Sequence, residues 1–479
     1  MLITLQNTQY GSYYAVKFDR YRQQVVDKFK ESITVDGRRW DKASGAWIVP
    51  ATNKGKAELD QFSYYIKHFE PVIWGDQKAV KSDEDIAYTL PDMPELEGDH
   101  GLKIEPYPYQ LQGIARGLQL KRFINGDDMG LGKTLEAIAT INKANAFPCL
   151  VICPNVVKIN WQREWAKFTD KKAMVLTDSV RESWPFFWQT GMNQVFIVNY
   201  ESLRKYFVRR ITKSEKWTLK DVEFHQTINL FKSVIIDESH KVKSTSTQQS
   251  KFCKGIASGK EYIILLTGTP VVNKPNDLVC QLGIMDRMID FGGWKYFMSR
   301  YCSGPNGASN LKELNFMLWK NCFFRREKSK VLTQLPDKVR QVMSCDITNR
   351  KEYQDAERDL IDYLKRYKEA DDEKIQKSLK GEVMVRIGIL KDITARGKLK
   401  EVIDFVKDFR ENGKKIILFC NLHEIVDRLL AAFPSAVCVT GRQNMEEKQA
   451  SVDAFQKSPK TDIIICSIKA ASAGITLTA

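Results

Sequence analysis

The chain of 479 residues is long enough for two to four domains with hydrophobic cores of their own. Its content of 43% hydrophobic and 28% charged residues is ordinary for a globular protein, and the sequence shows no collagen-like, coiled-coil or low-complexity repeat. The first residues lack the pattern of a signal peptide, and no apolar run reaches the ~18 residues that span a bilayer. We therefore expect a soluble intracellular protein of the cytoplasm or nucleoid, with the nucleus left open.

The net charge of +15 comes from 74 basic and 59 acidic residues. A positive excess of this size attracts polyanions, of which nucleic acid is the most common, although an enzyme that happens to be basic is the alternative. The ten cysteines form no Cys-x-x-Cys pair and the five histidines do not cluster. The sequence therefore favours reduced, mostly buried thiols over a zinc site or a disulfide framework.

Residues 1–75 are expected to form a small α+β module. A short helix over Asp19–Phe29 is followed by the segment Ile33–Pro50, whose two apolar ends flank a Lys-Ala-Ser-Gly turn. Such a pattern predicts a β-hairpin. Residues 76–105, which are polar and acidic as far as Gly98, are typical of a linker.

Residues 106–338 alternate short apolar runs with longer mixed segments, a pattern that predicts a parallel sheet covered by helices on both faces. The runs are CLVIC (149–153), VFIVNY (195–200), SVIID (233–237) and YIILLTG (262–268). Residues 339–397 are expected to be a helical connector, because 350–380 is charged and helix-like. A second alternating pattern over 398–479 has three strands: KKIILFC (414–420), AVCVTG (436–441) and DIIICS (462–467).

The most informative segment is Gly126–Thr134, GDDMGLGKT, between a short apolar strand and a helix-forming stretch. Its glycines let backbone N–H groups surround a phosphate, and the following helix adds the positive end of its dipole. Lys133 would contact the β- and γ-phosphates, and the Thr134 hydroxyl would bind Mg²⁺. Asp127 stands where the strict Gly-x-x-x-x-Gly-Lys-Thr pattern has glycine, so a glycine-rich turn that caps a helix remains an alternative. The expected ATP-binding residues of the loop are Asp127, Asp128, Met129, Gly130, Leu131, Gly132, Lys133 and Thr134.

The segment SVIIDESH supplies the acidic half of such a site. Asp237, at the end of an apolar strand, would hold Mg²⁺ through its water shell. Glu238 would orient and deprotonate the attacking water, so that Lys133, Asp237 and Glu238 form the expected catalytic set. A solvated strand-to-loop turn is the alternative for this acidic pair.

At this point the residues from 106 onward resemble the Swi/Snf-like DNA translocases of helicase superfamily two, in which aspartate at the position of Asp127 is normal. Gln110 matches the adenine-recognising segment, and DESH is a variant of Asp-Glu-Ala-His with Ser239 replacing alanine. The further segments that resemble family motifs are 151–168, 197–203, 266–278, 323–338, ILFCNL (417–422) and 467–478.

The resemblance implies two RecA-like lobes that bind ATP and Mg²⁺ between them. It implies residues that connect nucleotide state to DNA grip, namely His240, Thr267, Gly268, Thr269 and Gly474. It also implies DNA-backbone contacts, which we assign to Lys158 and Asn160. The family's next motif carries an arginine finger, and no such pattern precedes Ala479. We therefore expect either a fragment or a second lobe cut short, with ATP turnover crippled if 479 residues are the whole protein.

The segment GRRWDKASGAWIVP (Gly37–Pro50) resembles the HARP module of annealing helicases. In that interpretation the module grips branched DNA, and Arg38 and Arg39 contact phosphates. Trp40 and Trp47 are better explained as core residues of the hairpin than as base-stacking residues.

We expect a monomeric DNA-dependent ATPase that moves on duplex or branched DNA without sequence preference, in fork remodelling, strand annealing or repair. Two alternatives remain at this level. One is a helicase that separates strands, and the other is a DNA-binding protein with a crippled ATPase.

Overall fold

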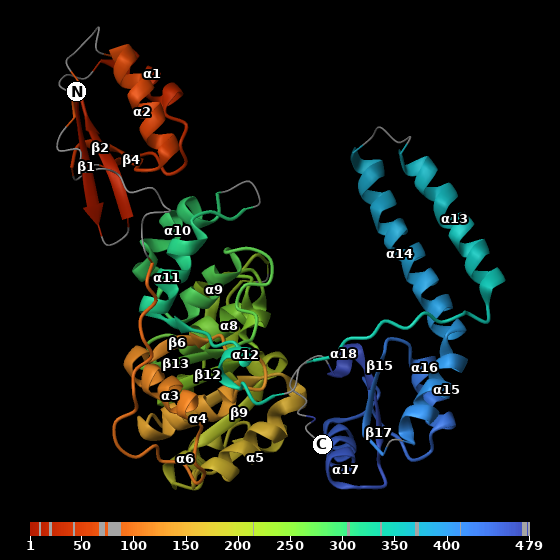
Figure 1. Cartoon of the computed structure of the whole chain (residues 1–479). Helices are drawn as coiled ribbons and strands as arrows, with labels where there is room; N and C mark the ends of the chain where they lie inside the picture. Colours follow the sequence, from red (N-terminus) through yellow and green to blue (C-terminus); the bar gives the residue numbers. More distant parts are fainter. Residues whose placement is uncertain are drawn as a thin grey trace. The chain divides into compact units, whose positions relative to one another are not determined.

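The computed structural model describes residues 1–8, 11–18, 22–41, 44–66, 72–74, 88–213, 215–303, 307–335, 338–368, 373–411, 413–471 and 477. The chain divides into two compact units, each considered by itself below (Figure 1). The first comprises Met1–Cys153 with Asn160–Gln334, and the second comprises Pro154–Ile159 with Leu335–Ala479. The finer division into modules and connectors remains a prediction. None of the described helices is long and apolar enough to cross a membrane.

The first unit begins with a small sheet whose strand order is β3-β4-β2-β1-β5. Neighbouring strands are antiparallel except for the pair β1 and β5. The strands are β1 Leu2–Thr8, β2 Gly11–Lys17, β3 Arg39–Asp41, β4 Ala46–Pro50 and β5 Ile73–Trp74, and the helices are α1 Gln23–Ser32 and α2 Asn53–Ile66. Phe29 of α1 and Phe62 of α2 are buried with strand residues such as Val16 in one core. The α+β module is thus present in the structure.

Strands β3 and β4 form the hairpin predicted for Ile33–Pro50, with Trp40 opposite Trp47. The predicted short helix is present as α1, which begins and ends later than expected. Trp47 packs against Phe29 at 5.5 Å between ring centroids. Trp40 is 49% exposed, so its assignment to the core is wrong. The physical reason is that β3 is an edge strand, which leaves its side chains with neighbours on one flank only.

The larger sheet of the first unit has the strand order β14-β6-β13-β12-β7-β9-β8, and every pairing in it is parallel. Its strands are β6 Arg122–Asn125, β7 Cys149–Cys153, β8 Ala173–Val175, β9 Val195–Asn199, β12 Ser233–Asp237, β13 Tyr262–Leu266 and β14 Phe323–Phe324. All residues of β7, β9 and β13 are buried, as expected for strands covered on both faces. The four apolar runs predicted as strands are confirmed, whereas β8 and β14 were not predicted.

Helices and one antiparallel strand pair complete the first unit (Figure 1). The helices are α3 Pro108–Leu120, α4 Lys133–Lys143, α5 Lys158–Phe168, α6 Trp184–Gln189, α7 Leu203–Phe207, α8 Gln248–Ala257, α9 Asp277–Ile284, α10 Gly293–Tyr301, α11 Leu311–Asn321 and α12 Lys328–Val331. The pair is β10 Val208–Ile211 with β11 Val222–Phe224. This arrangement confirms the predicted α/β class, a parallel sheet flanked by helices.

The second unit holds a parallel sheet of strand order β15-β17-β16 among its described residues. The strands are β15 Ile416–Cys420, β16 Val437–Val439 and β17 Ile463–Ser467, and all three coincide with predicted runs. The helices are α13 Arg350–Lys368, α14 Glu373–Gly397, α15 Leu399–Arg410, α16 His423–Ala432, α17 Met445–Lys457 and α18 Ile468–Ala471. The helix-like stretch 350–380 is confirmed over its described residues, 350–368 and 373–380, and α14 runs on to Gly397.

Candidate nucleotide site and a basic pocket

The candidate site lies where three neighbouring strands of the large sheet end. Strand β13 lies between β6 and β12, and Leu266 at its end pairs with Asn125 of β6 and with Asp237 of β12. Carboxyl ends of parallel strands meet at one edge of a sheet, where α/β proteins bind ligands. The loops that follow these strands contain the predicted segments 126–134, 237–240 and 267–269. The structure therefore brings together three segments that are far apart in sequence.

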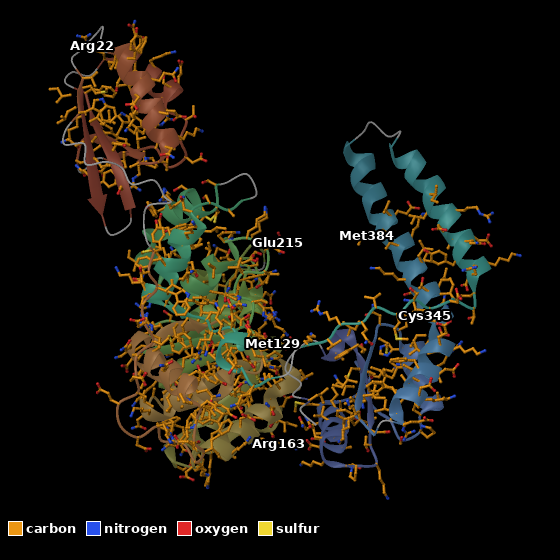
Figure 2. All side chains as sticks on the ribbon, in the orientation of Figure 1. Arg22, Met129, Arg163, Glu215, Cys345 and Met384 are labelled. Carbon is orange, nitrogen blue, oxygen red and sulfur yellow. The ribbon has the colours of Figure 1, made fainter. Side chains whose placement is uncertain are left out.

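The glycine-rich loop turns through two residues in the left-handed backbone region. Gly130 and Gly132 have φ angles of 87° and 91°, in the left-handed region that favours glycine. A Cβ added to Gly132 would lie 2.3 Å from Nε2 of Gln110, so glycine is needed there for space as well. Lys133 begins helix α4, whose first N–H groups point toward the loop, and Thr134 follows in the first turn. Met129 is 79% exposed at the tip of the loop (Figure 2).

Gln110, the predicted adenine contact, packs against this loop. It is 6% exposed, and its Nε2 donates to the carbonyl oxygen of Leu131 at 3.0 Å. Its Oε1 accepts from the backbone N–H of Tyr107 at 3.0 Å, while the Tyr109 hydroxyl donates to the same Leu131 oxygen. The structure thus gives Gln110 a role in holding the loop, and adenine contact remains a prediction.

Lys133 lies among carboxylates at the centre of the site. Its Nζ donates to the main-chain oxygens of Asp127 at 2.7 Å and Asp128 at 3.2 Å. Burial lowers the pKa of Lys133, while the carboxylates of Asp127, Glu238 and Asp237 oppose that effect. A Cβ on Gly268 would lie 4.0 Å from this Nζ. The residues predicted from three separate segments therefore converge on one ammonium group.

Asp237 is held in place by two donors. Trp161 Nε1 donates to its Oδ2 and the backbone N–H of Glu238 donates to its Oδ1, both at 2.9 Å. Burial raises the pKa of the Asp237 carboxyl to about 6, and the bond from Trp161 limits the rise. Trp161 was not recognised from the sequence, because an indole 76 residues from its partner gives no local signal.

Glu238 and the residues beside it form a polar chain toward the end of β13. Glu238 has φ 52° and ψ 49°, a left-handed conformation that is uncommon for a residue with a Cβ. Its Oε2 lies 3.2 Å from Nδ1 of His240, and the same nitrogen lies 3.2 Å from Oγ1 of Thr267. Thr267 Oγ1 also accepts from the backbone N–H of Thr269 at 3.1 Å. The structure therefore links three of the residues predicted to connect nucleotide state to DNA grip.

A buried charge cluster, unrecognised in the sequence, supports the loop from behind. The side chains of Asp127, Glu136 and Arg326 are 0%, 2% and 8% exposed. Arg326 Nη2 donates to both oxygens of Glu136, at 2.6 and 2.7 Å, and its Nε donates to Asp127. Asn125 Nδ2 donates to Glu136 at 2.9 Å. The only sequence signal was the position of Arg326 in the resemblance segment 323–338, which gave it no partner.

The residues predicted to contact DNA lie in different places. Arg39 is exposed on β3. The Arg38 guanidinium donates to the main-chain oxygens of Lys30 and Ile33, so it helps to hold the module's own backbone. Lys158 and Asn160 lie half-buried in the first turn of α5. Gly474, which was predicted to connect nucleotide state to DNA binding, lies outside the described residues. These assignments remain predictions.

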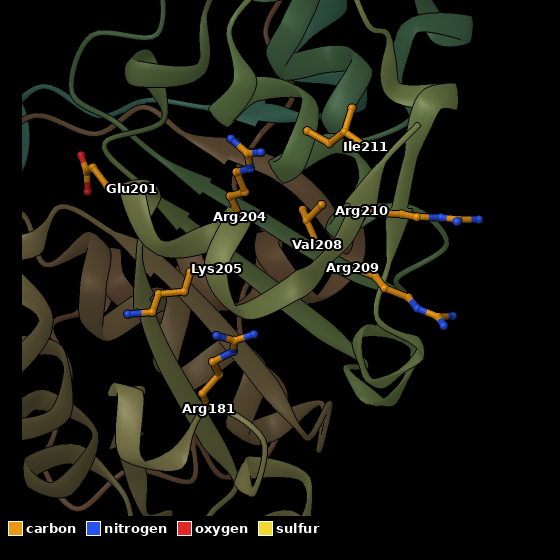
Figure 3. Close-up of a pocket in the computed structure, with 8 residues that line it drawn as sticks. All are labelled: Arg181, Glu201, Arg204, Lys205, Val208, Arg209, Arg210 and Ile211. Carbon is orange, nitrogen blue, oxygen red and sulfur yellow. The ribbon is translucent and has the colours of Figure 1, made fainter. Parts of the chain in front are cut away.

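The first unit also has a strongly basic pocket of about 400 Å³ (Figure 3). It is lined by Arg181, Glu201, Arg204, Lys205, Val208, Arg209, Arg210 and Ile211. Lys205 pairs with Asp178 and Arg210 with Glu223, whereas in the described part of the chain no carboxylate lies within 4 Å of the other three guanidinium groups. In Figure 3 Arg209 and Arg210, which belong to β10, project to one side of the view, away from Arg181, Arg204 and Lys205. No sequence pattern marked these residues as a site, although Glu201 lies in the predicted segment 197–203.

The parallel sheet, the glycine-rich loop and the acidic strand end together define a RecA-like, nucleotide-binding unit of the helicase type. Comparison with known families agrees: residues 109–400 match the SNF2-related domain, and residues 397–479 match the helicase conserved C-terminal domain. The chain therefore belongs to the SNF2-related family, whose members are DNA-dependent ATPases that use ATP.

Relatives with curated descriptions include the human "DNA annealing helicase and endonuclease ZRANB3", 28% identical over 401 residues that cover 79% of this chain and 35% of that protein. The Caenorhabditis elegans "SWI/SNF-related matrix-associated actin-dependent regulator of chromatin subfamily A-like protein 1 homolog" is 26% identical, covering 98% of this chain and 66% of that protein. The chain thus spans between about a third and two thirds of these relatives. The solved "Sulfolobus solfataricus SWI2/SNF2 ATPase core in complex with dsDNA" is 22% identical, with a TM-score of 0.42, covering 78% of this chain and 80% of that chain.

Proposed function

We propose that this protein hydrolyses ATP to ADP and phosphate and uses the reaction to move along DNA. The observation that carries the proposal is the convergence of Lys133, Asp237, Glu238 and Gly268 at three adjacent strand ends, in a chain of the SNF2-related family. A glycine-rich loop at a helix N-terminus, a buried lysine and a strand-end acidic pair are the parts that phosphoryl transfer from a nucleotide requires.

Each of these groups has a chemical part in the proposed reaction. The loop N–H groups and Lys133 would bind the triphosphate oxygens and stabilise the charge that develops as the γ-phosphoryl group leaves. Glu238 would orient the attacking water and accept its proton. The Asp237 carboxylate and the Thr134 hydroxyl are oxygen ligands of the kind that Mg²⁺ prefers, alongside water and phosphate oxygens. When bound, Mg²⁺ would neutralise phosphate charge.

DNA is the proposed track, bound through its phosphates. The protein carries a net charge of +15, and the basic pocket gathers five cationic side chains with one carboxylate. Contacts of this kind bind any sequence and weaken as salt rises. We include Arg204, Arg209 and Arg181 among the DNA contacts, in addition to the predicted Lys158 and Asn160.

We further propose that the output is fork remodelling or strand annealing. The human relative is named for annealing activity, and the alignment with the nematode relative covers 98% of the chain and therefore includes much of the N-terminal module. In that module Trp40 and Arg39 are exposed on an edge strand, a combination suited to contact bases and phosphates at a junction.

The ATPase proposal is tested by two substitutions measured with and without DNA. Lys133→Ala should abolish both nucleotide binding and hydrolysis, whereas Glu238→Gln should abolish hydrolysis and retain binding. Hydrolysis is followed by phosphate release and binding by calorimetry. Wild-type turnover in both variants would refute the assignment of the site.

The DNA part of the proposal is tested at the basic pocket. Arg204→Ala combined with Arg209→Ala should weaken binding to a plain duplex and reduce the dependence of affinity on salt by about one phosphate contact per lost cation. Lys171→Ala, which removes a cation elsewhere on the unit, is the matched control.

An assay with a labelled forked duplex then distinguishes annealing from strand separation, and net displacement of a strand would favour the helicase alternative.

A further inference from the structure

The segment by which the chain leaves the first unit is joined to the phosphate loop along its backbone. We call residues 322–328 the exit segment. Three hydrogen bonds connect it to β6 and the loop: Ile124 N–H to Cys322 O at 2.8 Å, Gly126 N–H to Phe324 O at 2.8 Å, and Asp128 N–H to Arg326 O at 3.1 Å. The parallel ladder between β6 and β14 thus continues beyond both strands. The first half of the phosphate loop is therefore fixed to the exit segment up to Asp128.

Side chains of the loop extend the same ladder. The Asp127 carboxylate accepts from the backbone N–H of Arg326 at 2.7 Å and from its Nε at 3.0 and 3.1 Å. The Asp128 carboxylate accepts from Arg325 Nη2 at 2.9 Å and from the backbone N–H of Lys328 at 3.0 Å. Each aspartate therefore accepts from one main-chain N–H and one arginine side chain of the exit segment, and Arg326 reaches Asp127 through both Nε and Nη2.

The bonds of Arg326 to Asp127 and of Arg325 to Asp128 differ in how deeply they are buried. Arg326 is buried and also serves Glu136, which lies in helix α4 directly behind the loop. Arg325 and Asp128 are 42% and 33% exposed, so their pair lies at the surface and tolerates substitution more easily. Removing the buried guanidinium would leave two carboxylates unpaired in the interior, whereas removing the outer one would leave a solvated carboxylate.

The two aspartates also face the phosphate side of the loop. Their main-chain oxygens accept from Lys133 Nζ at 2.7 and 3.2 Å. The same ammonium is the group that the proposed function assigns to the phosphates. A bound triphosphate would compete with these two oxygens for Lys133 and would change the position of Asp127 and Asp128. Because their carboxylates hold the exit segment, such a change reaches residues 325–328 directly.

We propose that Arg325 and Arg326 are positioning residues that transmit phosphate occupancy of the loop to the exit segment, and hence toward the part of the chain that follows it. The inference rests on the proposed nucleotide-binding function of the loop. In this route the effect of phosphate binding passes from Asp127 and Asp128 to the exit segment. The route is separate from the polar chain through His240 and Thr267.

The test is amide hydrogen exchange of the full chain with and without Mg²⁺ and the slowly hydrolysed analogue ATPγS. The amides of Arg326 and Lys328 are the probes, because each donates to a loop carboxylate. Exchange at both should change about five- to tenfold on binding, within the range of typical coupling between sites. In Arg325→Ala the change at Lys328 should be lost, while the affinity for ATPγS falls less than about threefold.

Arg326→Lys and Arg326→Gln test the buried residue. Both should weaken ATPγS binding, and lysine should recover part of the affinity because it keeps the charge but not the planar fork that serves two carboxylates. Lys330→Ala is the matched control, since Lys330 follows the exit segment in α12 and its ion pair among the described residues is with Glu327, away from the loop. Should Arg326→Gln fail to fold, Arg326→Lys, which keeps the buried charge, carries the test of this residue.

The outcomes separate the inference from the proposed function. If the wild type binds ATPγS and the two amides do not respond, the transmission is refuted while the nucleotide site stands. If Arg325→Ala retains the wild-type response, Arg325 has no positioning role and the inference fails in that part. If the wild type binds no nucleotide, both the inference and the proposed function are refuted.

Discussion

Glu238 combines the chemistry proposed for it with a strained backbone. Its φ of 52° places a residue with a Cβ in the left-handed region, which costs about 1–2 kcal/mol relative to right-handed conformations. In this left-handed conformation the Glu238 carboxylate lies beside His240. Strain of this kind persists only where the surrounding structure enforces it.

We expect Glu238→Gly to be more stable than Glu238→Ala by about 1 kcal/mol, because both lose the carboxylate but only glycine relieves the left-handed strain. Chemical denaturation of the two variants measures the difference. Both should be inactive as ATPases. Equal stability would show that this backbone position is not strained.

Asp237 predicts a pH dependence. Burial raises the pKa of its carboxyl to about 6, so the proton must leave before the carboxylate can serve Mg²⁺, and Mg²⁺-dependent nucleotide affinity should fall as the pH drops from 7 to 5. Trp161→Phe removes a hydrogen bond that favours the ionised form, so the steep part of the profile should move to higher pH. Calorimetric titrations of wild type and variant at matched pH values measure the shift. Protonation of the nucleotide is common to both proteins and cancels in the comparison; coincident profiles would contradict the prediction.

Single site residues could be predicted from the sequence where the residues next to them in the chain form a recognisable motif. Lys133 follows two glycines, and Asp237 and Glu238 end an apolar run, so each carries its own local signal. Arg326 and Trp161 do not, because they reach their partners across 199 and 76 residues. Only the fold brings such pairs together.

At the scale of elements, the hairpin of β3 and β4 shows that a residue on an edge strand can be more exposed than the same residue type on the neighbouring strand. Trp40 and Trp47 are directly opposite each other, with ring centroids 5.6 Å apart. Trp47 packs on Phe29 and lies near the cationic groups of Lys30 and Arg38, whereas Trp40 is half exposed. The spacing in the sequence cannot distinguish them, since both lie on the same face of the hairpin.

We expect Trp47→Ala to destabilise the N-terminal module by about 3 kcal/mol and Trp40→Ala by less than about 1 kcal/mol, because only the first opens a cavity. The loss is followed by exchange of the amides of β1 and β2 in the full chain. If Trp40→Ala instead weakens forked-DNA binding without unfolding the module, the proposed junction contact gains support. A larger loss of stability from Trp40→Ala would contradict the structural interpretation.

Strand prediction succeeded where strands are long and buried on both faces. The runs that became β7, β9, β12 and β13 are continuous and apolar, which is the pattern of a covered parallel sheet. Strand β14 has two residues and β8 has three, which is too short for any periodicity to show. Yet β14 lies within the exit segment. The strand that the sequence pattern does not predict is therefore part of the segment that holds the phosphate loop.

On the scale of the whole molecule, the N-terminal module should be separable from the motor. We expect removal of residues 1–75 to spare basal ATPase activity and to weaken binding to forked DNA more than to a plain duplex. The reason is that the residues of the nucleotide site all follow residue 106, whereas Arg39 and Trp40 lie in the removed part. Fluorescence anisotropy with both DNAs, and phosphate release, measure the two effects. Equal affinity of the full and shortened chains for forked DNA would refute the junction role of the module.

The distance along the chain between the phosphate loop and its exit segment also bears on biosynthesis. Asp127 and its partner Arg326 are 199 residues apart, so at about 5–20 residues per second a ribosome needs roughly 10–40 s to deliver the arginine after the aspartate. Throughout that interval the carboxylates of Asp127 and Glu136 lack the Arg326 guanidinium that pairs with them in the folded protein. The nascent loop would therefore mature late, when the last strand of the sheet arrives, and a stalled or prematurely ended chain would carry an unfinished nucleotide site for chaperones to recognise.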